Sequence, residues 1–396
     1  MTTSLTSSLA GLLDDLRTLV ECESPSADLD AVARSAEVVA QVGTARLGVA
    51  PERIVTDGRT HLRWRLGSGP SRVLLVGHHD TVWPLGSLTT HPFTVEGSDT
   101  GSDTGSDTGR VLRGPGCFDM KAGLVMGFHA AAGLDGVTIL VTGDEELGSP
   151  SSRGLIEDEA RLAEAALVLE ASADGGALKT ERKGVSLYEV VVVGRAAHAG
   201  LEPERGVNAT LELAHQALLV SALSDPALGT TVTPTAAHAG TTTNTVPAQG
   251  SFAVDVRVRT VAEQDRVDRA MRALSPVLPG AAVEVSGGPN RPPLEAASSE
   301  ALFERARALA VRLGLPEPTC AAVGGASDGN FTAGVGTPTL DGLGAVGGGA
   351  HADEEHVLVD ELPGRTALLR ALLEELLSSG LANSTNALVT TGAARP

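Results

Sequence analysis

Imidazole and carboxylate side chains follow three apolar runs of the sequence, each just after the run ends. The runs are VLLV, VTILV and ALVL, and the polar residues that follow them are His78, Asp80, Glu145, Glu146 and Glu170. If the runs are strands of an open α/β sheet, these residues gather at the edge where such sheets bind ligands. Histidine nitrogen and carboxylate oxygen are zinc ligands, so the chemistry to consider is metal-assisted hydrolysis.

Two further loops carry residues of the same types. Asp119 lies in RGPGCFDMKAG, and His351 lies in GGGAHADEEHV. Each has an ordinary interpretation, because an aspartate before a helix is commonly an N-cap and a histidine near a turn is commonly exposed. His356 is an alternative to His351 as a ligand. The glycine-rich run before His351 favours that residue, because it lets the backbone approach a crowded site.

Two histidines and three carboxylates suit a pair of zinc ions that share one carboxylate. The candidate ligands are His78, Asp119, Glu146, Glu170 and His351. Glu145 is then left unligated, as a general base beside a metal site requires. Alternation along a strand places Asp80 on the same side as His78, where its carboxylate can hold the second ring nitrogen.

Strands and helices must position these residues, and their alternation along the chain predicts an α/β catalytic domain. Its sheet is expected to be mostly parallel and covered by helices. Strands are expected at residues 72–76, 137–141 and 166–169, and helices at residues 4–21, 30–44, 120–134, 299–313 and about 360–379. Residues 381–396 are expected to form a disordered tail.

A different pattern occupies the middle of the chain. Strands are expected at residues 185–193, 229–239, 250–259 and 281–285, with helices at residues 207–223 and 261–278. The order β-α-β-β-α-β is ferredoxin-like. The Gly- and Pro-rich residues 287–293 are expected to be a linker. We therefore predict an inserted α+β lid or dimerisation domain at residues 183–292, between catalytic segments at 1–182 and 293–380.

The composition limits the possible partners and location. The chain has 396 residues and a net charge of −19, which argues against binding to nucleic acid or to an anionic membrane. Three scattered cysteines do not form a disulfide framework, and no signal peptide or membrane span is expected, so we predict a cytoplasmic protein. The repeated tract at residues 98–109, SDTGSDTGSDTG, is expected to be a solvated insertion rather than a calcium site.

The motifs resemble those of the di-zinc glutamate carboxypeptidase/aminoacylase metallopeptidase family, and most of all its carboxypeptidase G type. The resemblance runs from about residue 10 to residue 378 and rests on HHDTVWP, GPGCFDMKAG, TGDEELGS, VLEAS, GRAAHAGLEPERGVNA and GGGAHADEEHV. Met120 departs from the family pattern, which frequently has an acidic residue after the bridging aspartate. This departure removes no ligand.

The resemblance implies a role for each candidate. His78 and Glu170 would hold one zinc, and Glu146 and His351 would hold the other. Asp119 would bridge the two ions, and its peptide bond to Met120 would be cis. Asp80 would orient His78, and Glu145 would be the catalytic base. The substrate-binding residues would be His198, Asn244 and Arg257.

The family pattern also implies a homodimer, in which His198 reaches the partner subunit's active site, and cobalt or manganese as possible substitutes for zinc. Taken from the residues alone, His198 is an ordinary surface histidine, and Arg257 is an exposed strand arginine paired with Asp255. The alternative for Arg257 is that the N–H groups of its guanidinium bind a substrate carboxylate.

The expected function is hydrolysis of an amide bond that releases a C-terminal amino acid of glutamate type from a small amide or peptide with a free carboxylate. One alternative on the same scaffold is an N-acyl-amino-acid deacylase or a dipeptidase. An alternative of another class is a non-catalytic module that binds a small molecule or a metal. The pair Glu145-Glu146 argues against that module, because pure binding has no use for an uncoordinated base.

Overall fold

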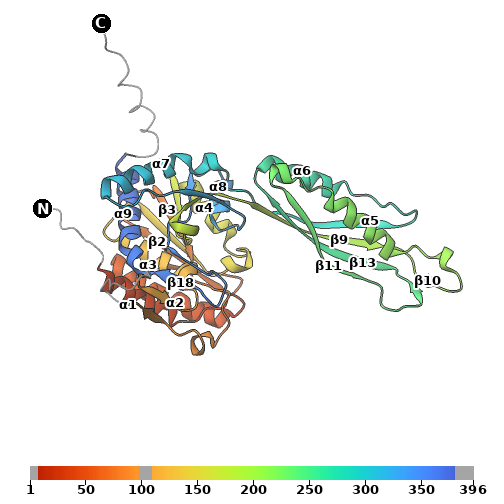
Figure 1. Cartoon of the computed structure of the whole chain (residues 1–396), viewed down its shortest axis with the longest axis horizontal. Helices are drawn as coiled ribbons and strands as arrows, with labels where there is room; N and C mark the ends of the chain where they lie inside the picture. Colours follow the sequence, from red (N-terminus) through yellow and green to blue (C-terminus); the bar gives the residue numbers. More distant parts are fainter. Residues whose placement is uncertain (1–7, 98–108, 380–396) are drawn as a thin grey trace, which may run out of the picture. The chain divides into compact units, whose positions relative to one another are not determined.

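The computed structural model describes residues 8–97 and 109–379, and these residues form two compact units (Figure 1). The larger unit comprises the described residues up to Thr180, Ala296–Val323 and the described residues from Ser327 onward. The smaller unit comprises Glu181–Glu295 and Gly324–Ala326. The predicted tail and all but the last residue of the predicted SDTG insertion lie outside the described residues.

The larger unit contains a six-stranded mixed sheet in which four adjacent strands are parallel. Its strands, in spatial order, are β1 (Glu52–Thr56), β2 (Arg59–Leu66), β6 (Val137–Thr142), β3 (Val73–His78), β7 (Ala165–Val168) and β16 (Thr339–Leu340). The first two strands are antiparallel to their neighbours and form a hairpin at one edge. The α/β class and the three predicted strands are confirmed, whereas the edge hairpin was not predicted.

Helices cover both faces of this sheet. Alternate side chains of β3 explain why: Val73 and Leu75 join one apolar core, and Leu74 and Val76 join another. The first core includes residues of α1 (Leu9–Val20), α2 (Leu29–Leu47), α3 (Ala122–Ala131), α7 (Ala296–Leu313) and α9 (Leu362–Ser379). The second includes residues of α4 (Arg153–Leu162) and α8 (Gly329–Gly334).

Two small sheets contain further strands of the chain. One is antiparallel, in the order β17 (Gly347–Gly348), β18 (His356–Leu358), β5 (Val111–Arg113) and β4 (Thr94–Glu96). The other pairs β8 (Leu178–Arg182) with β15 (Cys320–Val323). The pairing of β18 with β5 is important for the site, because the loops that carry Asp119 and His351 adjoin these two strands.

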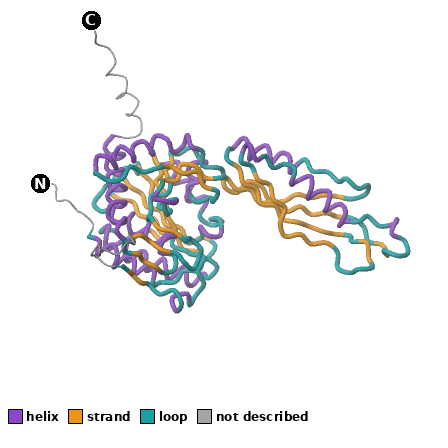
Figure 2. Tube along the Cα trace, in the orientation of Figure 1, coloured by secondary structure: helices purple, strands orange, loops and turns teal. Residues whose placement is uncertain are grey.

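The smaller unit has the ferredoxin-like order that the sequence predicts. Its elements along the chain are β9 (Gly184–Val193), α5 (Ala209–Ser221), β11 (Thr231–Ala239), β13 (Gln249–Val258), α6 (Val261–Arg272) and β14 (Ala282–Arg291). The strands form an antiparallel sheet in the order β11-β13-β9-β14, and both helices lie along it (Figure 2). A separate ribbon pairs β10 (Ala197–His198) with β12 (Thr245–Val246).

Two expectations for this unit are wrong in detail. Residues 287–291 of the predicted linker continue β14, which pairs with β9 through Pro289 and on to Arg291. A proline is tolerated there because β14 is an edge strand. The second helix ends at Arg272 rather than at residue 278, before a segment that contains Pro276, a residue that cannot continue a helix.

Candidate metal centre

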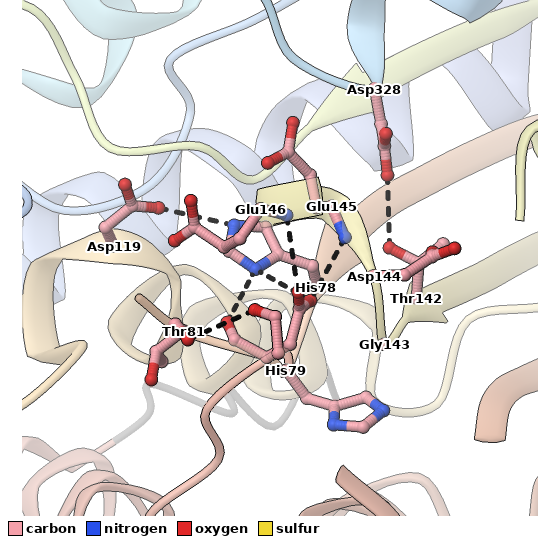
Figure 3. Close-up of polar contacts among 12 residues, drawn as sticks. His78, His79, Thr81, Asp119, Thr142, Gly143, Asp144, Glu145, Glu146 and Asp328 are labelled. Atoms are coloured by element: carbon pink, nitrogen blue, oxygen red, sulfur yellow. Dashed lines mark hydrogen bonds and ion pairs between the residues drawn. The ribbon is translucent and has the colours of Figure 1, made fainter. Parts of the chain in front are cut away.

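His78 lies at the end of β3, where its buried imidazole faces carboxylates from other loops (Figure 3). Its Nδ1 atom is 2.9 Å from the carbonyl oxygen of Asp80 and 3.4 Å from the Asp80 carboxylate. Because a carbonyl oxygen only accepts, this contact requires a proton on Nδ1. Nε2 lies 3.3 Å from Asp119 Oδ1 and 3.6 Å from Glu170 Oε1. Nε2 is therefore the nitrogen available to a metal.

Asp119 stands between the two histidines of the cluster. Its Oδ1 atom is 3.3 Å from His78 Nε2, and its Oδ2 atom is 3.2 Å from His351 Nε2. His351 Nε2 is also 3.2 Å from Glu146 Oε2. His78, Asp119 and Glu146 each offer a ligand atom within 4.8 Å of the others. One carboxylate thus contacts both halves of the cluster through different oxygens, as a bridging ligand does.

Asp119 is not the N-cap of α3, because Lys121 occupies that position. The peptide bond from Asp119 to Met120 is cis, as the family resemblance implies. Asp119 has φ −110° and ψ 91°, and α3 begins only at Ala122. The ordinary interpretation of this aspartate as an N-cap is therefore wrong.

The acidic triplet after β6 separates into different contacts. Asp144 turns toward the start of α4, where its carboxylate accepts hydrogen bonds from the backbone and hydroxyl of Ser151 and from the hydroxyl of Ser152. The backbone N–H groups of Glu145 and Glu146 donate to the Asp80 carboxylate, at 3.2 and 3.3 Å. Asp80 therefore fixes the loop that carries these two glutamates, in addition to its contact with His78.

His351 comes from a loop whose backbone needs glycine. His351 itself has φ 64°, and Gly349 has φ 74°. A Cβ atom at Gly349 would lie 2.8 Å from the backbone of Glu354 and Glu355. The tight turn brings His351 against Asp119 and Glu146 while its side chain stays half-exposed. The Nδ1 atom of His356 is hydrogen-bonded to the carbonyl oxygen of Glu354.

Glu170 follows β7 and is held from a second glycine-rich loop. Its carbonyl oxygen accepts a hydrogen bond from Gly344 N at 2.8 Å. The guanidinium of Arg365, on α9, donates to the carbonyl oxygens of Gly344, Gly342 and Gly176. Burial lowers the pKa of Arg365 to about 10. Arg365 was not predicted, and a lone arginine in a helical pattern gives no signal of such a role.

Glu355 is the main residue that the sequence analysis missed. The residue is 2% exposed, and its carboxylate accepts four hydrogen bonds, from the N–H groups of Gly116, Phe118 and Asp119 and from the indole of Trp83. Burial raises the pKa of Glu355, and these hydrogen bonds act in the opposite direction. The sequence did contain a signal for Glu355. It shares alternate positions with Val357 and Val359 on one buried face, and a buried carboxylate requires hydrogen-bond donors.

The two histidines of the cluster have raised pKa values. Burial opposes the charge of His78, but the nearby carboxylates of Asp119, Asp80 and Glu170 outweigh it and raise the pKa of His78 well above its usual value. Contacts with Asp119 and Glu146 raise the pKa of His351 to about 10. The neighbouring His79 differs, because burial lowers its pKa to about 4 and its ring contacts Thr60 and Ser35 instead. The cluster thus favours cations.

The donor set fits metal ions. Among the described residues, the buried atoms that have no hydrogen-bond partner include His78 Nε2, Asp119 Oδ1 and Glu146 Oε1. Leaving buried polar atoms unsatisfied is costly in free energy unless a ligand satisfies them. Because His78, Asp119 and Glu146 each offer a ligand atom within 4.8 Å of the others, a divalent cation bound among them would supply partners for such atoms.

The substrate-binding candidates lie in the smaller unit. His198 pairs with Thr245 across the β10–β12 ribbon, and the Asn244 carbonyl accepts a hydrogen bond from Ala199 N at 2.9 Å. The structure therefore brings His198 and Asn244 side by side. The His198 side chain is exposed, and its Nδ1 atom accepts a hydrogen bond from Gly200 N.

Arg257 lies elsewhere in the smaller unit. It lies near the end of β13. The chain enters this strand from β12 at Gln249, eight residues before Arg257. Eight residues of strand span about 26 Å. The Arg257 guanidinium makes a two-pronged ion pair with Asp255, at 2.8 and 2.9 Å. This pair is the ordinary alternative that the sequence left open, and a role for Arg257 in substrate binding stays a prediction.

Residues 74–375 match the family model described as Peptidase family M20/M25/M40. The chain belongs to this family. It is 32% identical to carboxypeptidase G2 of Pseudomonas sp. (strain RS-16) over 309 residues, which are 73% of this chain and 70% of that relative. The expected family and its carboxypeptidase G type are therefore confirmed. As a member of the M20 family, the chain is a metal-dependent hydrolase of the metallopeptidase class.

Solved structures of M20-type fold agree with this assignment. Aminopeptidase PepT from Bacillus cereus ATCC 10987 superposes with a TM-score of 0.71 at 22% identity, covering 93% of this chain and 99% of that one. An M20 family metallo-carboxypeptidase from Sulfolobus solfataricus gives 0.64 at 18% identity, covering 92% and 98%. At these identities the likeness concerns the fold. Within the described residues, no helix has both the length and the apolar character needed to cross a bilayer.

Proposed function

We propose that this member of the M20 family is a carboxypeptidase of the G type, which releases a C-terminal amino acid of glutamate type by hydrolysing an amide bond. The observation that carries the proposal is the likeness to carboxypeptidase G2, combined with a cluster of ligand-type side chains at the sheet edge. The substrate would be a small amide or peptide with a free carboxylate.

Two zinc ions per subunit are the proposed cofactors, with cobalt or manganese as substitutes. His78 and Glu170 would hold one ion, and Glu146 and His351 the other, since each pair faces Asp119 from its own side. With neutral histidines, the four carboxylates Asp119, Glu145, Glu146 and Glu170 carry four negative charges. Two divalent ions balance that charge, which supports two ions rather than one.

When bound, the metal ions supply Lewis acidity, which polarises the scissile carbonyl and lowers the pKa of water. Glu145 would take the proton from the attacking water and return it to the leaving amine. Its position supports this role, because it lies directly before the proposed ligand Glu146 and is largely buried. Asp80 would keep His78 in the required tautomer and hold the Glu145 loop at the same time.

The substrate contacts require a homodimer in this proposal. His198 and Asn244 are neighbours at the β10–β12 ribbon, whereas Arg257 lies about 26 Å along β13 from Gln249, where the chain enters that strand after the ribbon. This separation is too large for one small substrate. The three residues can act on one substrate if His198 and Asn244 come from the partner subunit. Arg257 would grip the substrate carboxylate, and its charge offsets the net charge of −19. We propose that the enzyme works in the cytoplasm.

The test is a panel of small amides incubated with the zinc-loaded protein and assayed by amine release. We expect the fastest release from acyl-glutamate compounds, no release after chelation, and recovery with zinc, cobalt or manganese. Preferential cleavage of neutral N-acyl amino acids or of dipeptides would instead assign the alternatives on the same scaffold. Failure of the metal-loaded protein to cleave any member of the panel would support the non-catalytic module.

A further inference from the structure

Two strands bring the loops of Asp119 and His351 together. Strand β18 pairs with β5, and His356 lies opposite Arg113. The chain leaves β5 toward Asp119, and it enters β18 from the turn that carries His351. Glu355 is the last residue of this turn, so its side chain reaches the Asp119 loop just beyond the paired strands.

The Glu355 carboxylate accepts hydrogen bonds from backbone N–H groups along most of the Asp119 loop. Its Oε1 atom is 2.9 Å from both Phe118 N and Asp119 N, and its Oε2 atom is 3.0 Å from Gly116 N. Converging backbone N–H groups of this kind make an anion-binding concavity, which here is filled by the protein's own carboxylate. The N–H group of Asp119 itself is one of these donors, so its backbone position depends directly on Glu355.

Trp83 adds a third segment to the same carboxylate. Its indole nitrogen donates to Glu355 Oε2 at 2.6 Å. Trp83 lies five positions after His78, in the loop that leaves the proposed ligand. Glu355 therefore contacts the loops of two proposed ligands directly, and it sits four positions from a third.

We propose that Glu355 is a positioning residue of the metal centre, which ties the loops of His78, Asp119 and His351 together through hydrogen bonds to backbone and indole N–H groups. It touches no metal ion or substrate in this role. The inference rests on the proposed metal ligands. Its consequence is that Glu355 sets the distance between Asp119 and His351, and hence the affinity of the site that they share.

The experiment is zinc titration of the metal-free protein against a coloured chelator, with Glu355→Gln as the variant. An amide keeps the shape but places an NH₂ group against N–H donors, so the loop loses acceptors. We expect the affinity for at least one zinc ion to fall about 10- to 100-fold. At saturating zinc, kcat should fall while KM changes little, because substrate contacts are not involved. The control is Glu354→Gln, which makes the same change of charge at an exposed neighbour.

Thermal unfolding of each metal-free variant separates positioning from general damage. Trp83→Phe removes one of the four donors, and we expect a smaller loss of zinc affinity in the same direction. Wild-type zinc affinity in Glu355→Gln, or in Trp83→Phe if the first variant does not fold, would overturn the inference. So would an equal loss in Glu354→Gln. If the wild-type protein itself binds no zinc, the proposed ligands fail instead, whatever the variants show.

Discussion

The two units of this chain hold their candidate site residues in contrasting ways. In the larger unit, side chains from separate loops converge within hydrogen-bond range, and Asp80 and Glu355 fix the loops that carry them. In the smaller unit, the candidates are more exposed, and Arg257 is already paired with Asp255. The difference indicates that contacts within the larger unit fix its site residues, whereas the proposed role of the smaller unit depends on substrate and a second subunit.

The largest effect should come from the proposed base. Glu145→Gln removes proton transfer but keeps the size of the side chain, so we expect kcat to fall about 10²- to 10⁴-fold with zinc content unchanged. Steady-state kinetics and elemental analysis of the same sample measure both quantities. Near-normal turnover would place the base elsewhere and weaken the contrast between the units.

Loss of zinc should follow removal of either histidine ligand, with different costs in stability. We expect His78→Ala and His351→Ala each to lose about one zinc ion per subunit. His78 is 1% exposed, so its removal should also lower the melting temperature more than removal of the half-exposed His351. Full zinc occupancy in both variants would refute the ligand assignment.

Mixing two inactive variants tests whether the smaller unit acts across a dimer. A subunit with Glu145→Gln still offers His198, and a subunit with His198→Ala still offers Glu145. If His198 serves the partner, random exchange restores about a quarter of the wild-type activity, since half of the dimers regain one of two sites. A mixture that stays inactive although sedimentation shows mixed dimers would contradict this arrangement.

Arg257 should affect substrate binding more than turnover. We expect Arg257→Ala to raise KM about 10- to 100-fold, as hydrogen bonds to a charged group are worth about 1.5–3 kcal/mol. Asp255→Asn is the matched control, because it breaks the ion pair but leaves the guanidinium in place. If both variants change KM equally, the arginine is only a partner of Asp255.

The smallest effect concerns stability within the smaller unit. The buried Glu212 carboxylate on α5 accepts hydrogen bonds from Val277 N, Leu278 N and Gln216. Burial raises its pKa, but these contacts prevail and lower it below the usual value. Its stabilisation is therefore full above the unfolded pKa of about 4.3 and is lost as pH falls through the folded pKa.

We expect Glu212→Gln to lower the free energy of unfolding by about 1–3 kcal/mol at neutral pH. The difference from wild type should shrink in acid, and denaturant melts at several pH values measure it. The control is Glu284→Gln on the exposed side of β14, which should leave the free energy nearly unchanged.

The sequence predicted most of what apolar patterning controls. Strands β3, β6 and β7 are continuous buried runs, and the polar residues after them do meet at one edge. The β1–β2 hairpin was missed although residues 62–66 alternate between buried apolar side chains and arginine. It lies at a sheet edge, where one face of a strand can carry charge.

Local composition could not settle two other features. Gly287, Gly288 and Pro289 are typical of a linker, but long-range pairing with β9 keeps them in a strand. The contacts of Glu355 join segments more than 230 positions apart, and no short-range rule connects such positions. The ligand residues were easier to find, because strand ends give them a common location before any contact is known.

The acidic triplet after β6 has a consequence for protein engineering. Asp144 is bound to the serines at the start of α4, Glu145 is the proposed base, and Glu146 faces His351. If these proposed roles hold, three consecutive codons encode three separable traits: anchorage of the loop, speed of the reaction and retention of the ion. A directed-evolution library could diversify one of these traits while holding the two adjacent codons constant.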